Sequence, residues 1–377
     1  PLIRRVQQER HLAYTETRYT DDVVPKWVNG VLTNADTYRL RLPCEVLTYE
    51  LTGIGLQDES DQVSTDDPYD NLYFTLDELR RFRLSPVHQS SGEGEVVHDI
   101  SYHHLPDRAT PSKKEKRLIE HSRTLFFNEN LVDPLPFGEH GRLGLTYEAY
   151  KLALTDTLLD AVFKDSTGKN KLDEAIDGTK TTRDKLQDAK VSGYLNGAVL
   201  AARFKGLDTT GQYWIRSGIA GFAPDAAQHF YFPERYIDPF DNTTTLEYDP
   251  RDLFVASSTD AMTNTTDVTH FDFRVLAPRE MKDINDNLSE VFFDVLGLPA
   301  AMAVKGKGTE GDNLTRFDDT PANLNLTNPG LADLAAIFTT SPYDEAQARR
   351  WLGNATARHV YYFGEIEETL ADGSTAI

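Results

Sequence analysis

Hydrophobic and polar positions repeat between residues 234 and 300 with a period of 22 to 23 residues. Each repeat places an aspartate four residues before an asparagine, and then ends on an aromatic residue followed by a second aspartate. The repeats are 234–255, 256–278 and 279–300, and their aromatic endings are Tyr248-Asp249, Phe271-Asp272 and Phe293-Asp294. Because this period is typical of stacked supersecondary units, the repetition predicts a structural role before a catalytic one.

Each repeat has the composition of a β-hairpin. Residues 243–249 and 289–294 concentrate β-branched and aromatic residues, as strands require, and Asp, Asn and Pro residues before them favour turns. A lone hairpin cannot bury a face in water, so neighbouring hairpins must stack. We therefore predict consecutive antiparallel hairpins in one sheet, with the three aromatic residues at matching, largely buried positions.

The aspartate–asparagine pairs are best interpreted as turn residues whose side chains bond nearby backbone N–H groups. These pairs are Asp238 with Asn242, Asp260 with Asn264, and Asp283 with Asn287. Calcium is the alternative, because residues 283–287 offer oxygen ligands at alternate positions, as an EF-hand loop does. Leu288 stands where that loop needs glycine, and Asp294 stands where it prefers glutamate, so the pattern favours turns.

Upstream of the repeats, β-rich segments are interrupted by polar loops. Residues 11–20 and 44–53 read as strands on either side of an Asn29-Gly30 turn signal. Residues 58–69 and 85–96 read as loops, and residues 74–82 read as a short helix in which Thr75 and Glu78 form a capping box.

The remaining segments alternate between the two element types. Residues 117–127 alternate as a strand, and residues 145–163 show the period of an amphipathic helix. An exposed insertion with some helix is expected at 164–190, and strands and turns at 211–224. Beyond the repeats we expect a loop at 306–319 and two short helices, at 331–338 and 343–353.

These elements predict a mainly β protein: a curved antiparallel sheet of stacked hairpins with a few short helices. Three regions follow from the pattern. Residues 1–233 form a β-rich region with a helical insertion near 145–190, residues 234–300 form the repeats, and residues 301–377 form a loop and short-helix segment.

Composition changes this picture mainly by exclusion. The chain has 377 residues, 60 of them acidic and 39 basic, and its formal net charge of −21 repels nucleic-acid phosphates and anionic lipids. The sequence contains no run of 18 apolar residues, so it predicts no membrane-spanning helix. The chain starts at Pro1, which suggests a trimmed or excised chain, and no signal peptide is recognised there.

Candidate catalytic residues are few. The zinc-helix, phosphate-loop and nucleophile-elbow motifs are absent from the sequence. Ser217 is better interpreted as a turn serine than as a nucleophile. The neighbouring His103 and His104 would point to opposite faces of a strand, so they cannot share one metal without a third element. His121 could work with Glu120 or Arg123, although a strand histidine satisfied by cross-strand partners is the simpler interpretation.

Three residue types bear on redox state and binding. The single cysteine, Cys44, excludes an internal disulfide and reads as a buried thiol. Three tryptophans, Trp27, Trp214 and Trp351, are spread too widely to indicate a carbohydrate-binding module. Asn-x-Ser/Thr sequons occur at six asparagines, three of which belong to the repeat itself: Asn242, Asn264, Asn287, Asn313, Asn325 and Asn354.

The repeats resemble YD repeats of the RHS family, in which a D-x-x-G-N-x-T turn leads to a Tyr-Asp ending. Asp241, Thr263 and Asp286 replace the glycine of that turn, which implies tighter or altered turns. Stretches such as YTETRYTDD, KRLIEHSRTLFFNENL, LPFGEHGRLGLTYEAYKLALT and HFYFPERYIDPFDNTTT resemble successive segments of the B component (TcB, TcaC-like) of ABC-type insecticidal toxin complexes, from about residue 8 to 305.

This resemblance implies part of a β-sheet shell that, with a C component, encloses a toxic cargo and docks onto a pore-forming A component. It implies a secreted virulence factor with no cofactor and no transferable catalytic residue. Its expected partners are those two components, or further copies of this chain pairing through sheet edges. The alternative is a free-standing hydrolase that reuses the β scaffold, with a cleft built from loops such as 85–110 and 164–190.

Overall fold

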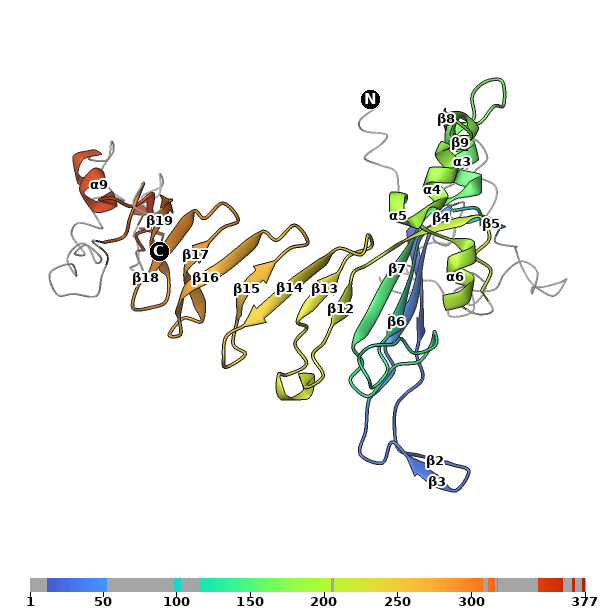
Figure 1. Ribbon diagram of the computed structural model, residues 1–377, viewed down its shortest axis with the longest axis horizontal. Coiled ribbons are helices and arrows are strands. Elements are labelled where there is room, and N and C mark those ends of the chain that lie inside the picture. Colours follow the sequence, from blue (N-terminus) through green and yellow to red (C-terminus); the bar gives the residue numbers. More distant parts are fainter. Residues whose placement is uncertain are drawn as a thin grey trace. The chain divides into compact units, whose positions relative to one another are not determined.

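The computed structural model describes most of the chain. The described residues are 12–52, 98–102, 115–204, 207–307, 311–315, 317, 345–361, 368–369 and 375–376. They form mainly antiparallel β-sheet with a few short helices (Figure 1), which confirms the predicted fold class. The predicted helix at 74–82, the loops at 58–69 and 85–96, the helix at 331–338, and His103 and His104 lie outside the described residues.

The first sheet has seven strands in the order β1-β4-β6-β7-β11-β10, with β5 pairing to β6 in parallel. Its strands are β1 (Leu12–Tyr19), β4 (Pro43–Thr52), β5 (His98–Ile100), β6 (Glu115–Phe126), β7 (Thr146–Thr155), β10 (Leu195–Asn196) and β11 (Gln212–Arg216).

Short helices and hairpins follow or interrupt these strands. They are β2 (Lys26–Val28), β3 (Val31–Thr33), α3 (Asp156–Phe163), η2 (Lys171–Asp173), β8 (Ala175–Asp177), β9 (Lys180–Thr181), α4 (Thr182–Gln187), α5 (Ala189–Ser192) and α6 (Gly197–Arg203). The β2–β3 hairpin turns at Asn29 and Gly30, both of which have positive φ, as the sequence predicted.

The second sheet has nine strands that pair in chain order from β12 to β20. They are β12 (Ile219–Gly221), β13 (Arg235–Ile237), β14 (Thr243–Tyr248), β15 (Val255–Thr259), β16 (Thr265–Asp272), β17 (Ala277–Lys282), β18 (Leu288–Phe293), β19 (Pro299–Gly306) and β20 (Ala357–Arg358). The remaining elements are η3 (Ala226–Gln228), α9 (Glu345–Leu352), β21 (Glu368–Thr369) and β22 (Thr375–Ala376).

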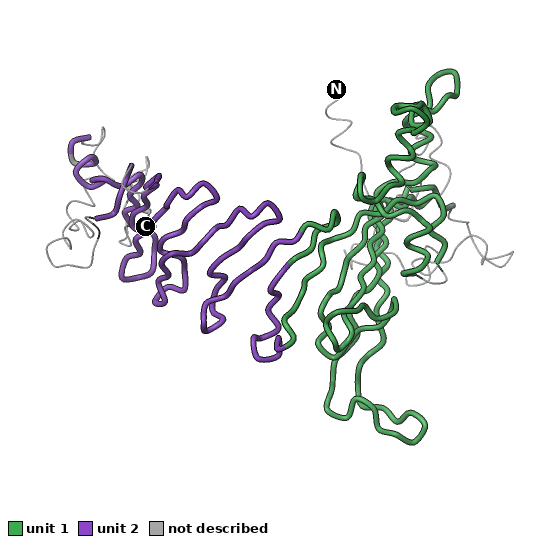
Figure 2. The backbone as a smooth tube through the Cα atoms, in the orientation of Figure 1, with its two compact units in different colours: residues 1–224, 236–242 green, residues 225–235, 243–377 purple. Residues whose placement is uncertain are grey.

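The chain divides into two compact units (Figure 2). Unit 1 comprises residues 1–224 and 236–242, and unit 2 comprises residues 225–235 and 243–377. The core of unit 1 contains Leu152, Leu200, Phe204 and Trp214, each at most 2% exposed. The core of unit 2 gathers at β18 and β19, around Phe292 and a set of alanines.

The predicted antiparallel hairpins are confirmed, because strands β14 to β19 pair successively as neighbours. The pairing register shifts immediately before each of the three repeat aromatics, Tyr248, Phe271 and Phe293. The three residues therefore occupy equivalent positions. Each is partly covered, lying between the fully buried and the exposed residues. Phe271 stacks flat on Phe254, with ring centroids 3.8 Å apart.

The predicted helix at 145–163 is wrong in its first half. Residues 146–155 form strand β7, and the helix begins only at Asp156. In β7, Glu148, Tyr150 and Leu152 lie on one face and are all buried, which is a period of two rather than 3.6. The side chain of Thr155 then caps α3 by accepting a hydrogen bond from Leu158 N.

Candidate functional site

A buried carboxylate joins three strands of the first sheet. Glu45 on β4 is 4% exposed. Its Oε1 accepts hydrogen bonds from His121 Nε2 at 2.7 Å and Arg123 Nε at 2.8 Å, both on β6, and its Oε2 lies 3.2 Å from Arg18 Nη1 on β1. The cross-strand register brings them together, because Glu45 lies opposite both Arg18 and Arg123.

Aromatic rings enclose the two β6 members of this cluster. The Arg123 guanidinium lies over the rings of Phe137, Phe204 and Trp214, at 4.9 to 5.8 Å from their centroids. The His121 ring meets the Trp214 ring edge-on, with centroids 4.8 Å apart. Cation–π contacts gain strength when they are removed from water, so the aromatic enclosure stabilises the Arg123 guanidinium in the core.

The electrostatics of the cluster favour a fixed carboxylate. Burial alone would raise the pKa of Glu45, but the hydrogen bonds from His121 and Arg123 outweigh it and lower the pKa to about 2. Burial lowers the pKa of His121, with the hydrogen bond to Glu45 opposing this shift. His121 is therefore neutral near pH 7, and its Nε2 carries the proton because a carboxylate can only accept.

A second buried carboxylate lies two strands away in the same sheet. Glu148 on β7 is fully buried, and its oxygens lie 3.0 Å from Arg203 Nη1 on α6 and 3.4 Å from Arg216 Nη1 on β11. The Tyr150 hydroxyl donates to the same carboxylate. Burial and the charge of Glu148 raise the pKa of Tyr150, so the phenol stays protonated. Arg216 Nη2 also donates to the carbonyl of Pro239.

These clusters hold strands and helix α6 together rather than presenting a reactive group. Glu45 and Glu148 already accept hydrogen bonds or ion pairs at both oxygens. Within the described part of the chain, no serine or cysteine contacts the His121 ring. Cys44 and Glu45 are adjacent in β4, so their side chains point to opposite faces. Nucleophilic catalysis needs a nucleophile within reach of its base, and this geometry does not supply one.

Two open clefts adjoin the first sheet. One of about 470 Å³ lies along β1 and β4 and includes Arg18 and Glu45 in its lining. Another of about 460 Å³ lies between β5 and the start of α3 and includes Asp99 and Asp156. Asp99 is paired with Lys116 at 3.4 Å, and Asp156 with Arg183 at 3.1 Å, so each carboxylate in the cleft already has a cationic partner.

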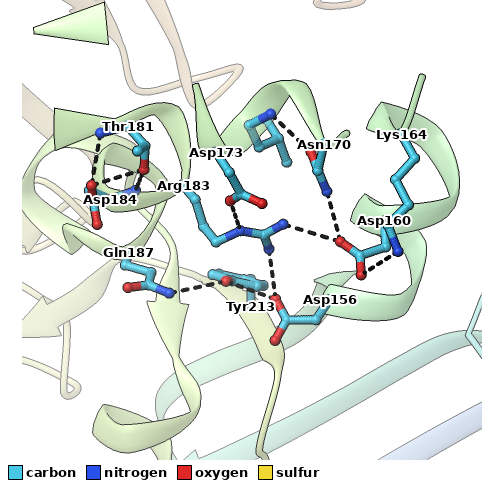
Figure 3. A network of polar contacts seen from close by, with 11 residues as sticks. Asp156, Asp160, Lys164, Asn170, Asp173, Thr181, Arg183, Asp184, Gln187 and Tyr213 are labelled. Carbon is cyan, nitrogen blue, oxygen red and sulfur yellow. Dashed lines mark hydrogen bonds and ion pairs between the residues drawn. The ribbon is translucent and has the colours of Figure 1, made fainter. Parts of the chain in front are cut away.

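A single arginine organises the insertion at 164–190 (Figure 3). The guanidinium of Arg183 reaches Asp173 at 2.6 Å, Asp156 at 3.1 Å and Asp160 at 3.2 Å, and so joins α4, η2 and α3. The hydrogen bond to Asp173 is the main cause that raises the pKa of Arg183. Tyr213 donates from β11 to Asp156, which anchors the insertion to the sheet. The predicted insertion with some helix is confirmed, and its polar network is structural.

The three aspartate–asparagine turns are the same, hydrogen bond for hydrogen bond. In each, one aspartate oxygen accepts from the backbone N–H groups two and four residues later, at 2.8 to 2.9 Å. The other oxygen accepts from the asparagine Nδ2, at 2.9 to 3.1 Å. The predicted turn role is therefore confirmed. The side-chain and backbone hydrogen bonds of the asparagine lower the pKa of Asp238, Asp260 and Asp283.

The residue before each asparagine takes the left-handed conformation that glycine would take. Asp241, Thr263 and Asp286 have φ of 67°, 68° and 62°. Gly297 occupies the same position in a fourth turn, built on Asp294, with φ of 83°. The expectation of tighter or altered turns is therefore wrong: the geometry is retained, and the non-glycine residues carry the strain.

The same contacts bear on the calcium alternative. Asp283 uses both oxygens within its own turn, and Asp294 uses Oδ1 to accept from Leu296 N and Leu298 N. Among the described residues, no group of three or more His, Cys, Asp or Glu side chains is arranged to hold a metal ion.

None of the described helices is long and apolar enough to cross a membrane.

The other sequence candidates lie apart from one another. Ser217 lies between β11 and β12, where its Oγ accepts from Ala149 N and donates to the carbonyl of Gly218. Cys44 is 1% exposed, and burial raises its pKa, as expected for an inert thiol. Glu120, the suggested partner of His121, pairs with Lys151 instead. Trp27 is 73% exposed whereas Trp214 is fully buried.

Sequence reasoning missed Glu45, Glu148, Arg203 and Arg216. None of the four lies on β6, where the candidates His121 and Arg123 were found, and charged residues are usually exposed, so their burial had no local cue. Only β6 itself offered a signal, because both alternating faces of 115–126 contain apolar residues, which indicates a strand covered on both sides.

Comparisons with known proteins give a distant structural likeness. No family model matches the chain, and no curated protein matches it. The crystal structure of TcdB2-TccC3-Cdc42 matches with a TM-score of 0.44 and 18% identity over 85% of this chain and 12% of that chain. The crystal structure of TcdB2-TccC3 matches with a TM-score of 0.44 and 17% identity, over 85% of this chain and 13% of that one. This chain therefore spans about an eighth of the length of the solved chains that it matches.

Proposed function

We propose that this chain is a wall segment of a larger β-sheet shell of the toxin-complex type, which holds or helps deliver a polypeptide cargo. Its partners would be a C-component-like RHS protein and an A-component translocator, and its site of action would be outside the producing cell. The chain itself contributes structure and binding surface, not catalysis.

The repeated turn is the observation that supports this proposal most. Three turns share the hydrogen bonds of their aspartate and asparagine side chains, and the strands between them pair in chain order. Such an array extends a sheet by one hairpin per repeat without needing a new core for each. Apolar side chains also stay exposed at the turns between these strands, including Met262 at 80% and Val295 at 82%. Exposed apolar groups along an array are typical of a surface that meets another polypeptide.

The buried ionic clusters support a structural role for unit 1. Charged groups in a core must be paired, and a buried pair is strongly destabilised when one partner is removed. Glu45 and Glu148 each hold two cations, and they tie β1, β4, β6, β7, β11 and α6 into one body. A rigid wall needs this kind of cross-linking, whereas a hydrolase needs a base with free capacity.

Co-purification tests the proposal. The full chain should co-elute with a C-component-type RHS protein when the two are expressed together, and it should show no turnover on esterase, glycosidase and phosphatase substrates. Ser217→Ala and Cys44→Ala serve as matched controls that leave the ionic clusters intact. Saturable turnover that either variant abolishes, with an unchanged circular dichroism spectrum, would replace the shell by the hydrolase alternative.

A further inference from the structure

Strand β19 of the repeat sheet has an edge that its own sequence protects only at the two ends. Residues 300–304 read AAMAV and carry no charge, and Met302 and Val304 are 42% and 58% exposed. Natural edge strands usually avoid pairing with another chain by carrying charges, prolines within the strand, or bulges. In β19 the proline is the first residue, Lys305 lies at the far end, and the register shifts fall near the two ends of its pairing with β18. If it were bare, the stretch between them would be a site for edge-to-edge association.

A separate segment of unit 2 occupies this edge. We name the edge cap as residues 311–313 and 354–361. The carbonyls of Ala300, Met302 and Val304 accept hydrogen bonds from the backbone N–H groups of His359, Thr356 and Asp312, at 2.9, 2.9 and 3.2 Å. The cap strand β20 adds only two residue pairs to the ladder.

Thr356 is the central contact of the edge cap. Its Oγ1 accepts from Val304 N at 2.9 Å and donates to Asp312 Oδ2 at 2.5 Å. Asn313 N then bonds the carbonyl of Asn354 at 2.8 Å, which closes the two halves of the cap on each other. One hydroxyl thus satisfies an outward N–H of β19 that a neighbouring strand would otherwise satisfy.

Buried apolar residues beside the edge cap also cover β19. Ala300, Ala301 and Ala303 are at most 4% exposed. They belong to one buried cluster with Leu314 and Phe317, which follow the first half of the cap, and with Ala355 of the cap itself. The edge cap holds the strand edge through a few hydrogen bonds and not through a full strand.

We propose that the edge cap is an autoinhibitory contact: it blocks strand addition at β19, and its release lets β19 pair antiparallel with β19 of a second copy of this chain. A second copy is the favoured occupant, because the uncharged run in β19 can pair with itself without placing like charges opposite each other. This inference rests on the cap contacts and does not depend on the proposed function.

Two matched variants test the pinning role of Thr356. Thr356→Val removes the hydroxyl and keeps the shape, whereas Thr356→Ser keeps the hydroxyl. We expect hydrogen exchange at Val304 N to accelerate roughly tenfold or more in Thr356→Val, a difference of about 1.4 kcal/mol in opening, and to stay near wild type in Thr356→Ser. Equal protection in both variants would overturn the role of the hydroxyl.

Association is the second readout. Sedimentation velocity across a wide concentration range should show a monomer for wild type and a dimer that grows with concentration for Thr356→Val. Adding Met302→Lys to that variant places a charge in the middle of the edge, and it should restore the monomer while Val304 N still exchanges fast.

His359→Pro gives an independent release of the edge cap, because it removes the N–H that bonds Ala300. The circular dichroism spectrum and exchange protection of unit 1 identify any variant that fails to fold. A Val304 amide that opens in both released variants without dimer formation would overturn the proposal, as would a wild-type chain that already dimerises through β19.

Discussion

Thr263→Gly should stabilise the chain, although it removes a side chain. Thr263 holds a positive φ of 68° in the second aspartate–asparagine turn. The left-handed region costs an L-residue about 1–2 kcal/mol, and it is least tolerated by β-branched residues. Glycine adopts the same φ freely but loses about 0.5–1 kcal/mol in backbone entropy on folding. The expected net gain is about 0.5–1 kcal/mol.

The reverse change is available in the fourth turn. Gly297 has φ of 83°, and a Cβ placed there would approach Val275 Cγ1 at 2.9 Å. Gly297→Ala should therefore destabilise unit 2 by about 1–2 kcal/mol, because it adds the left-handed penalty and a contact that Val275 must yield to. If the second and fourth turns share one backbone geometry, Thr263→Gly should raise the free energy of unfolding and Gly297→Ala should lower it.

Urea denaturation followed by circular dichroism measures both changes, with hydrogen exchange of β15 and β16 reporting the local effect of Thr263→Gly. Asp238→Ala, which removes the acceptor of the first turn, serves as a destabilising reference. A Thr263→Gly variant less stable than wild type by more than about 0.5 kcal/mol, the spread of ordinary surface substitutions, would refute the reasoning.

Three further predictions concern unit 1. Glu45→Gln should lower the free energy of unfolding by about 3 kcal/mol in chemical denaturation, because the buried Arg123 loses its counter-charge, and a loss below about 1 kcal/mol would contradict the cluster. Folding depresses the pKa of Glu45 to about 2, so its ionised form stabilises the folded state. In an acid titration of wild type, this contribution to the free energy of unfolding should be complete above about pH 4.5 and fall by about 3 kcal/mol towards pH 2. Glu45→Gln should lack this pH-dependent contribution. Arg183→Met should speed hydrogen exchange in α3 and α4 while leaving β6 protected, and an unchanged exchange pattern would refute its organising role.

The repeats could be predicted because their signal is local. Turn chemistry, strand propensity and the 22 to 23-residue period all agree in 234–300, so pairing order and the role of Asp238 followed directly. Burial could not be predicted in the same way. Whether Tyr248 is covered depends on what lies over the sheet, and periodicity within one repeat says nothing about that.

The buried clusters and the helix error share one cause. Residues 146–155 contain aromatic and apolar residues at helical spacing, yet β6 and β11 on either side fix them as a central strand. Non-local pairing therefore overrode a local pattern. Glu148 became buried by the same pairing, and its cations come from Arg203 and Arg216, more than 50 residues away in the chain. Such partnerships leave no signature in one sequence.

Protease protection of an enclosed polypeptide tests the central claim most directly. The full chain would be co-expressed with a C-component-type RHS protein that carries its C-terminal cargo, and the mixture would be treated with protease. The account predicts that the cargo becomes resistant only when this chain is present, and that resistance disappears when the assembly is dissociated. A cargo degraded equally with and without a co-eluting chain would contradict it.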